Sequence, residues 1–227
     1  MSREIVLDTE TTGFEPSQGH RLVEIGCVEL INYVPTGRIF HAYINPERAV
    51  PEEAYNVHGL SYDFLKDHSL FKDVAHLFLD FIEDSPLVIH NAKFDMKFLN
   101  AELKSHEWPE IPFSRAIDTL VMARKKFPGS PASLDALCKK FGVDNKARDK
   151  HGALLDAELL ASVYLELIGG KQPGLSLAFS SRDEENLSVD SAERQISRPV
   201  RNHQPTQEER DLHLSLLGKL KDPLWVG

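Results

Sequence analysis

Apolar and polar positions follow two patterns along the chain, short runs typical of strands and longer repeats typical of helices. The short runs predict β-strands at residues 4–8, 22–31, 38–44, 87–89 and 116–119. Pro35-Thr36-Gly37 lies between the second and third runs and is expected to turn them into a hairpin.

Apolar residues at three- and four-residue spacing predict helices in the other segments. The predicted helices are residues 73–82, 91–103, 120–126, 134–141 and 155–168, with loop and short helix at 51–65. The apolar stripe of the first helix consists of Val74, Leu77, Phe78, Phe81 and Ile82. A three-strand meander followed by alternating strands and helices predicts an α/β fold, with a mixed sheet and helices packed on it.

The composition changes after residue 170, which divides the chain into three predicted parts. Residues 1–170 form the domain, and residues 171–205 contain a polar tract without periodicity, typical of a disordered linker. A capping-box pattern at Thr206 and Glu209 predicts renewed order in residues 206–227. The apolar positions of this last segment are Leu212, Leu216, Leu220, Leu224 and Trp225. An isolated helix of this length is marginal in water, so its stripe requires a surface on the domain or on another protein.

Composition limits the classes of protein to which the chain could belong. Apolar residues make up 41% of it, but no apolar run approaches a membrane span, so we expect a cytoplasmic protein without membrane contact. Cys27 and Cys138 lie in apolar patterns and are predicted to be buried thiols. The net charge of −9 argues against binding nucleic acid by bulk electrostatics. Basic clusters at residues 124–126 and 146–150 are either local guides for a nucleic-acid backbone or ordinary solvated faces.

Acidic residues in three separate segments carry the candidate chemistry. Asp8 and Glu10 close the first predicted strand, where the two-residue period places both carboxylates on one face. Asp95 lies in the helix predicted at 91–103, and Asp156 follows His151 near the start of the last helix. These carboxylates would repel one another and a phosphodiester, so the set predicts a site for divalent cations such as Mg²⁺ or Mn²⁺.

His151 and Asp156 cannot share one face of a regular helix, because five residues correspond to about 140° around the axis. Gly152 removes the difficulty if His151 lies in a loop and the helix begins just after it. We therefore predict a loop histidine that can reach the water used in catalysis.

The acidic residues lie in three longer motifs. They are VLDTETTG at residues 6–13, HNAKFDMKFL at residues 90–99 and HGALLD at residues 151–156. Together and in this order they resemble the DEDDh family of 3′→5′ exonucleases. The resemblance implies a ribonuclease H-like exonuclease fold, with a mixed five-stranded sheet flanked by helices.

The resemblance also implies hydrolysis supported by two divalent cations, with nucleoside 5′-monophosphates as products. Asp8, Glu10, Asp95 and Asp156 would be the metal ligands, and His151 the general base. The substrate-binding residues that it implies are Asp8, Glu10, Thr11, His58, His90, Phe94 and Asp156. For Phe94, packing in the helix core remains an equal alternative.

Within the family, residues 118–124, 127–129 and 133–138 resemble the proofreading subunits of bacterial replicative DNA polymerases. This implies three partners: a single-stranded or frayed DNA 3′ terminus, the polymerase alpha subunit and the sliding clamp. The catalytic domain is expected to be monomeric. The implied clamp-binding residues are Leu175, Leu177 and Phe179, and the implied polymerase-docking residues are Leu212, Leu216, Leu220 and Trp225. Gly174 occupies the position at which clamp-binding peptides usually carry a glutamine. The alternative is that this segment is an ordinary apolar stretch leading out of the domain.

Two other functions remain open on the sequence alone. A stand-alone nuclease that trims DNA or RNA 3′ ends would share every catalytic residue, but it leaves the apolar C-terminal segment without a role. A non-enzymatic bridging protein would not require all five active-site positions to be filled.

Overall fold

The computed structural model describes residues 2–145, 151–169 and 205–219. The chain divides into two units, Met1–Ser176 and Leu177–Gly227. The first contains a five-stranded sheet in the order β3-β2-β1-β4-β5. The strands are β1 Arg3–Thr11, β2 Leu22–Ile31, β3 Val34–Tyr43, β4 Leu87–Ile89 and β5 Ala116–Asp118. The first three strands pair antiparallel, and β1, β4 and β5 run parallel, so the predicted mixed sheet is confirmed.

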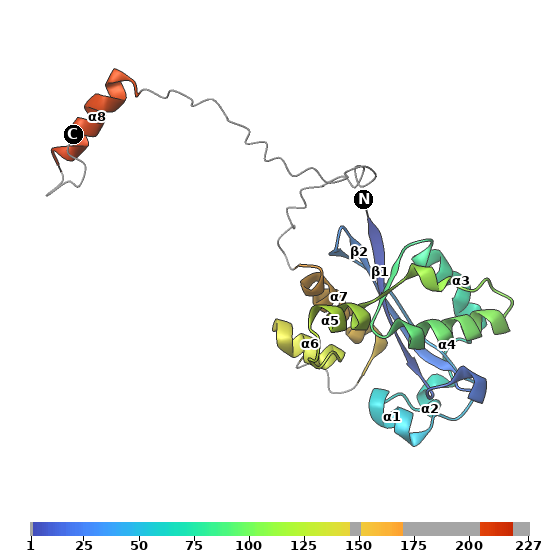
Figure 1. The fold of residues 1–227 in the computed structure, drawn as a ribbon. Coiled ribbons are helices and arrows are strands. Elements are labelled where there is room, and N and C mark those ends of the chain that lie inside the picture. The colour runs from blue at the N-terminus through green and yellow to red at the C-terminus, as the bar shows by residue number, and fades with distance from the viewer. Residues whose placement is uncertain (1, 146–150, 170–204, 220–227) are drawn as a thin grey trace, which may run out of the picture. The chain divides into compact units, whose positions relative to one another are not determined.

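Helices cover both faces of this sheet (Figure 1). On one face lie α3 Phe71–Ile82 and α4 Ala92–Ser105, and on the other α5 Thr119–Lys126, α6 Leu134–Phe141 and α7 Ala153–Leu167. Two shorter helices, α1 Glu52–His58 and α2 Tyr62–Leu65, follow β3, and single 3₁₀ turns occur at Pro16–Gln18 and Phe113–Arg115. Cys27 and Cys138 are buried thiols, as predicted, and they lie on opposite faces of the sheet.

The hairpin between β2 and β3 turns at a different place from the predicted one. Asn32 and Tyr33 form the turn, and both have positive φ, the backbone conformation of a tight two-residue hairpin loop. The expected turn at residues 35–37 instead lies inside β3, where the pairing register shifts. Gly37 has a φ of 85°, which a bulge can require and which a glycine adopts without steric cost. The Pro-Thr-Gly sequence therefore marked a bulge, and the prediction of the turn was wrong.

A second correction concerns α3, where Leu77 belongs to the predicted apolar stripe. Its side chain is exposed, whereas Val74, Phe78 and Ile82 are buried. Ala75 occupies the buried position next to them. The periodicity argument uses only residue type, and a leucine is apolar whether it is buried or exposed. It therefore assigned one residue too many to the core.

The second unit contains α8, Gln207–Leu217. Thr206 and Glu209 form the predicted capping box, in which the Thr206 side chain accepts from the Glu209 N–H and the Glu209 carboxylate accepts from the Thr206 N–H. Leu212 and Leu216 are exposed on this helix. Among the described residues, no helix combines the length and the apolar character needed to span a membrane.

A buried carboxylate on β1 makes the stability of the domain depend on pH. Glu4 accepts a hydrogen bond from the Tyr164 hydroxyl of α7 at 3.2 Å, and its second oxygen has no partner among the described residues. Burial raises the pKa of Glu4 above its ordinary value, with the Tyr164 hydrogen bond as a smaller opposing effect. The folded state therefore favours the protonated acid, and this contribution to stability is lost as pH rises through the raised pKa.

Glu4→Gln is accordingly expected to raise the melting temperature at pH 7 and to leave it nearly unchanged at pH 4. The exposed Glu107→Gln is the matched control and should change neither value. Thermal unfolding at both pH values checks this. A Glu4→Gln protein that melts lower than the parent at pH 7 would show that the charged carboxylate is the stabilising form.

Candidate active site

The carboxyl end of β1 supplies the first two acidic side chains of the site. Asp8 and Glu10 alternate with Thr9, so they project toward one face of the sheet, as predicted. It is the face that carries α7. Asp8 pairs across the sheet with Gly26 of β2. This pairing brings the acidic strand next to the place where the last helix of the domain begins.

Gly26 allows α7 to approach the sheet closely. A Cβ atom at this position would overlap the backbone of Ala153 and Leu154, in the first turn of that helix. Any larger residue would push the helix away from β1 and β2. Gly26 thus determines how near Asp156, one turn further along α7, can come to Asp8 and Glu10.

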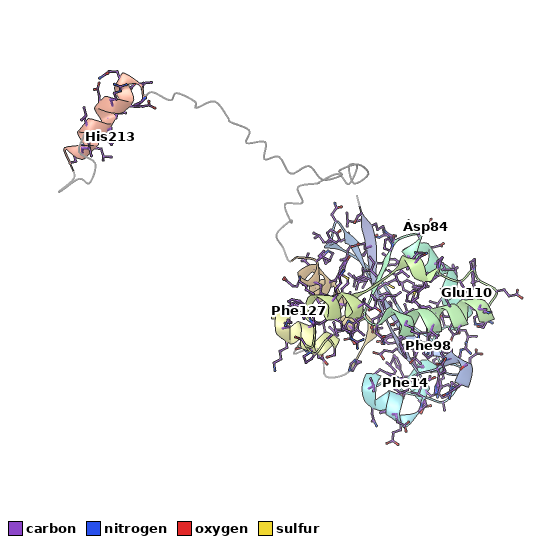
Figure 2. All side chains as sticks on the ribbon, viewed as in Figure 1. Phe14, Asp84, Phe98, Glu110, Phe127 and His213 are labelled. Atoms are coloured by element: carbon purple, nitrogen blue, oxygen red, sulfur yellow. The ribbon has the colours of Figure 1, made fainter. Side chains whose placement is uncertain are left out.

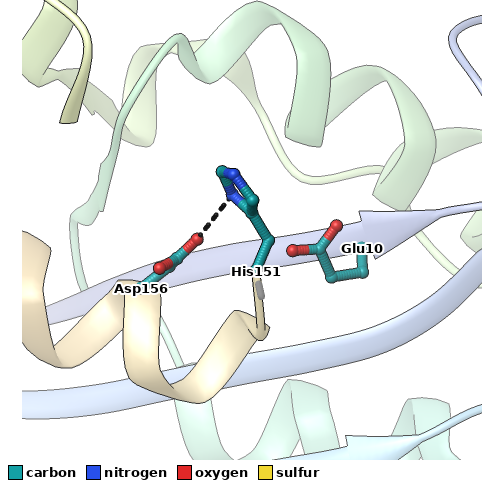
Figure 3. A group of neighbouring side chains, drawn as sticks. All are labelled: Glu10, His151 and Asp156. Carbon is teal, nitrogen blue, oxygen red and sulfur yellow. Dashed lines mark hydrogen bonds and ion pairs between the residues drawn. The ribbon is translucent and has the colours of Figure 1, made fainter. Parts of the chain in front are cut away.

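His151 lies in the loop just before α7, as the spacing analysis predicted. Gly152 is the N-cap residue of the helix, and the Asp156 N–H donates to the Gly152 carbonyl. The His151 Nδ1 atom lies 3.2 Å from Asp156 Oδ2 (Figure 3). A proton on Nδ1 satisfies this contact and leaves the imidazole lone pair on Nε2, where the ring can accept a proton as a general base.

Glu10, His151 and Asp156 converge on one point. A ligand atom from each lies within 4.8 Å of the others, and Figure 3 shows the two carboxylates on either side of the imidazole. Carboxylate oxygens suit hard divalent cations, and a ring nitrogen is also an accepted ligand. The donor set therefore fits a divalent cation.

Asp95 approaches the same region from α4, on the other face of the sheet. Asp95 is 2% exposed, and Thr9 Oγ1 donates to Asp95 Oδ1 at 2.8 Å. Burial raises the pKa of Asp95 to about 7, although the Thr9 hydrogen bond opposes the shift. A nearby cation would relieve this burial cost, so Asp95 also fits a metal site.

One cavity of about 270 Å³ collects these side chains. Its lining includes all five predicted catalytic and metal-binding residues, namely Asp8, Glu10, Asp95, His151 and Asp156. His90 and Phe94 line it as well. The His90 Nδ1 atom lies 3.0 Å from the Thr119 hydroxyl, and burial lowers the pKa of this histidine. The folded chain therefore assembles three distant motifs into a single acidic cavity.

A second, larger cavity of about 500 Å³ shares Glu10 and Phe94 with the first. The predicted substrate residues Thr11 and His58 line it. The Thr11 hydroxyl donates to the Gly13 carbonyl, and His58 Nδ1 accepts from the Leu60 N–H. Phe94 also packs on Phe98 in the core, with ring centroids 5.1 Å apart, as the core-packing alternative predicts. Contact between Phe94 and a substrate stays a prediction.

The sequence analysis missed two residues of the site, Phe14 and Thr9. Phe14, 83% exposed, lines the larger cavity, and an exposed aromatic residue just after the first motif was the available signal. Thr9 holds Asp95, a contact across 86 residues that local sequence does not reveal. Asp118 accepts from Leu120 and Val121 N–H at the start of α5 and from the Ala92 N–H at the start of α4. This fixes the position of the helix that carries Asp95.

Several predicted binding residues lie outside the described residues. They are Leu175, Leu177, Phe179, Leu220 and Trp225, together with the basic cluster at residues 146–150. In the other basic cluster, Lys126 donates to the Glu166 and Leu167 carbonyls at the end of α7. That lysine therefore caps a helix.

The fold and the acidic cavity define a nuclease of the exonuclease class. The family model described as Exonuclease matches residues 5–164. The nuclease domain of 3′hExo, a DEDDh family member bound to rAMP, shares the fold with a TM-score of 0.64 at 21% identity, over 74% of this chain and 92% of that one.

Curated relatives place the chain more narrowly. It is 53% identical over 221 residues to the DNA polymerase III subunit epsilon of Rickettsia felis, covering 96% of both chains. It is 46% identical over 191 residues to the Escherichia coli K12 protein of the same name, covering 81% of this chain and 77% of that one. The chain belongs to the exonuclease family and, within it, to the DNA polymerase III epsilon subunits. The predictions of family, fold class and 3′→5′ exonuclease function are thereby confirmed.

Proposed function

We propose that this chain proofreads DNA for a replicative polymerase by removing mismatched 3′-terminal nucleotides as 5′-monophosphates. The single observation that carries the proposal is the cavity in which Asp8, Glu10, Asp95, His151 and Asp156 meet. Support for the replicative role comes from the identity to epsilon subunits along nearly the whole chain. The reaction is proposed to take place in the cytoplasm.

In this proposal, Asp8, Glu10, Asp95 and Asp156 hold two divalent cations, either Mg²⁺ or Mn²⁺. The bound cations would supply Lewis-acid activation of water and stabilisation of the leaving 3′ oxygen. His151 takes the proton from the attacking water at Nε2, and Asp156 orients the imidazole through Nδ1. Thr9 holds the Asp95 carboxylate in place.

The larger cavity is proposed to receive the terminal nucleotide. Its lining is mostly apolar, and it meets the acidic cavity at Glu10 and Phe94. A base in the larger cavity would therefore leave its phosphate beside the carboxylates. Thr11 and His58 line the part of this cavity predicted to meet the sugar and the base. Because only an unpaired end can enter, a mismatched terminus is favoured: its unpairing costs less.

A primer–template assay tests this function. A 5′-labelled primer carrying either a matched or a mismatched 3′ nucleotide is incubated with the full chain and Mn²⁺. We expect stepwise shortening from the 3′ end, faster for the mismatch, and none with EDTA. Degradation from the 5′ end, or endonucleolytic fragments, would contradict the proposal.

The C-terminal part of the chain is proposed to bind the partners. Leu212 and Leu216 lie exposed on α8, which suits docking to the polymerase alpha subunit, with Leu220 and Trp225 further along the chain. Leu175, Leu177 and Phe179 would bind the sliding clamp from the segment 171–205. We propose that residues 1–170 act as a monomeric catalytic domain joined to these elements. A tether of this kind raises the effective concentration of the nuclease at the primer end.

Size-exclusion chromatography with the alpha subunit of the same host separates this function from that of a stand-alone nuclease. The full chain should co-elute, and a truncation after Gly170 should not. If both forms degrade 3′ ends and neither co-elutes, the stand-alone nuclease is the better account.

A further inference from the structure

A groove of about 410 Å³ runs along the exposed side of α4. Its basic lining residues are Lys93, Lys97 and Lys104, and Met96, Asn100, Ala101, Glu110 and Phe113 complete the lining. At 100° per residue the three lysines lie within about 40° of one another around the helix axis. They therefore form a single basic face in a chain whose net charge is −9.

The loop that follows α4 forms one wall of the groove. Asn100 holds this loop with two hydrogen bonds, donating to the Ile111 carbonyl and accepting from the Ile111 N–H at 2.9 and 2.8 Å. The Phe113 side chain, 57% exposed, stands at the rim. Glu110, labelled near the end of α4 in Figure 2, is the one carboxylate among the described lining residues, and its Oε1 lies 3.8 Å from Lys104 Nζ. The groove thus keeps a net positive charge.

Lys97 connects this groove with the larger cavity of the active site. Its ammonium group donates to the Phe14 carbonyl at 2.9 Å and to the Glu15 carboxylate at 2.8 Å. The same group lies 6.0 Å from the centre of the Phe94 ring. Phe14 and Phe94 both line the larger cavity, so a strand that leaves it over these rings meets the groove directly.

We propose that this groove binds the single strand upstream of the 3′ terminus, with Lys93 and Lys104 contacting its phosphates and Phe113 stacking on a base. The inference rests on the proposed function, because it extends the path of the same strand. The two lysines are eleven residues apart, about 16 Å along the helix, so they can reach different phosphates. A positive groove with an aromatic platform is how proteins bind single strands without sequence preference.

The test compares two substrates with the full-length Lys93→Gln/Lys104→Gln variant. The first is a fluorescent twelve-nucleotide single strand, whose Kd is measured in EDTA at several salt concentrations. The second is the p-nitrophenyl ester of thymidine 5′-monophosphate, hydrolysed with Mn²⁺ and too short to reach the groove. Lys72→Gln/Lys139→Gln, at exposed positions on α3 and α6, is the control with the same change of charge.

We expect the Kd for the oligonucleotide to rise about tenfold at low salt. The slope of log Kd against log salt should fall by about 1.4, since each phosphate contact on a single strand contributes about 0.7. The KM for the ester should stay within twofold of the parent value. Phe113→Ala should raise the Kd about fivefold without changing the slope, because stacking releases no counterions. The control should leave both parameters unchanged.

Three outcomes would overturn the inference. They are an unchanged salt slope, equal losses for the oligonucleotide and the ester, or an equal effect from the control variant. A parent protein that does not hydrolyse the ester with Mn²⁺ would instead contradict the proposed function, so the two failures are distinguishable.

Discussion

Asp8→Asn is expected to lower the rate of 3′-terminal hydrolysis by about 10³-fold or more, because each loss of about 1.4 kcal/mol in transition-state stabilisation costs a factor of ten. Asp8 lies on β1 opposite Gly26 and lines the acidic cavity. Asparagine keeps the shape of the side chain but removes the charge that a cation would neutralise. The expected loss therefore comes from metal binding, with the sheet unchanged.

Two measurements distinguish this explanation from unfolding. In EDTA the variant should melt at the parent temperature or slightly above it, because one charge is removed from a cluster of like charges. Added Mn²⁺ should raise the melting temperature of the parent and raise that of the variant much less. Asp80→Asn, at an exposed position on α3, is the control and should behave as the parent does. Full activity in Asp8→Asn would remove Asp8 from the metal site.

His151→Gln is expected to lower the rate by about 10²- to 10⁴-fold, the usual contribution of a positioned general base. The effect of this substitution on metal binding shows whether His151 is a general base or a metal ligand. The contact with Asp156 suits a base that acts through Nε2, yet the imidazole is also close enough to Glu10 and Asp156 to be a ligand. A general base can be lost while the carboxylates still bind the cation.

Calorimetric titration with Mn²⁺ in the absence of substrate separates these roles. We expect the Mn²⁺ affinity of His151→Gln to stay within a few-fold of the parent value while the rate collapses. An affinity that falls in proportion to the rate would make His151 a metal ligand. His76→Gln, exposed on α3, serves as the control.

Much of the fold could be predicted because its signals are local. The ranges of β2, β4 and α6 match the predicted ones, since each is a compact apolar pattern between clear turn or capping residues. Ser133 illustrates this, because its side chain accepts from the Ala136 N–H and starts α6 where predicted. The hairpin turn was misplaced because Asn32-Tyr33 is a less obvious turn sequence than Pro-Thr-Gly.

The candidate site likewise has some features that local sequence predicts and others that it does not. The carboxylates and the loop histidine lie in motifs that can each be recognised in the sequence. Because the motifs together resemble one exonuclease family, the resemblance predicts that these residues meet in one cavity. The residues that bring them together act across the fold: Gly26 by the absence of a side chain, Thr9 by a hydrogen bond to α4, and Asp118 by capping two helices. Local sequence does not predict these long-range contacts, because the residues that form them become neighbours only when the chain folds.

The most direct test of the site is a crystal structure of the full chain with Mn²⁺ and a nucleoside 5′-monophosphate, with the metal located by anomalous scattering. We predict Mn²⁺ in the cavity of Asp8, Glu10, Asp95 and Asp156, with the phosphate beside it and the base in the larger cavity lined by Phe14 and His58. Mn²⁺ bound elsewhere, or a nucleotide whose phosphate lies away from these carboxylates, would contradict the assignment of this cavity as the active site.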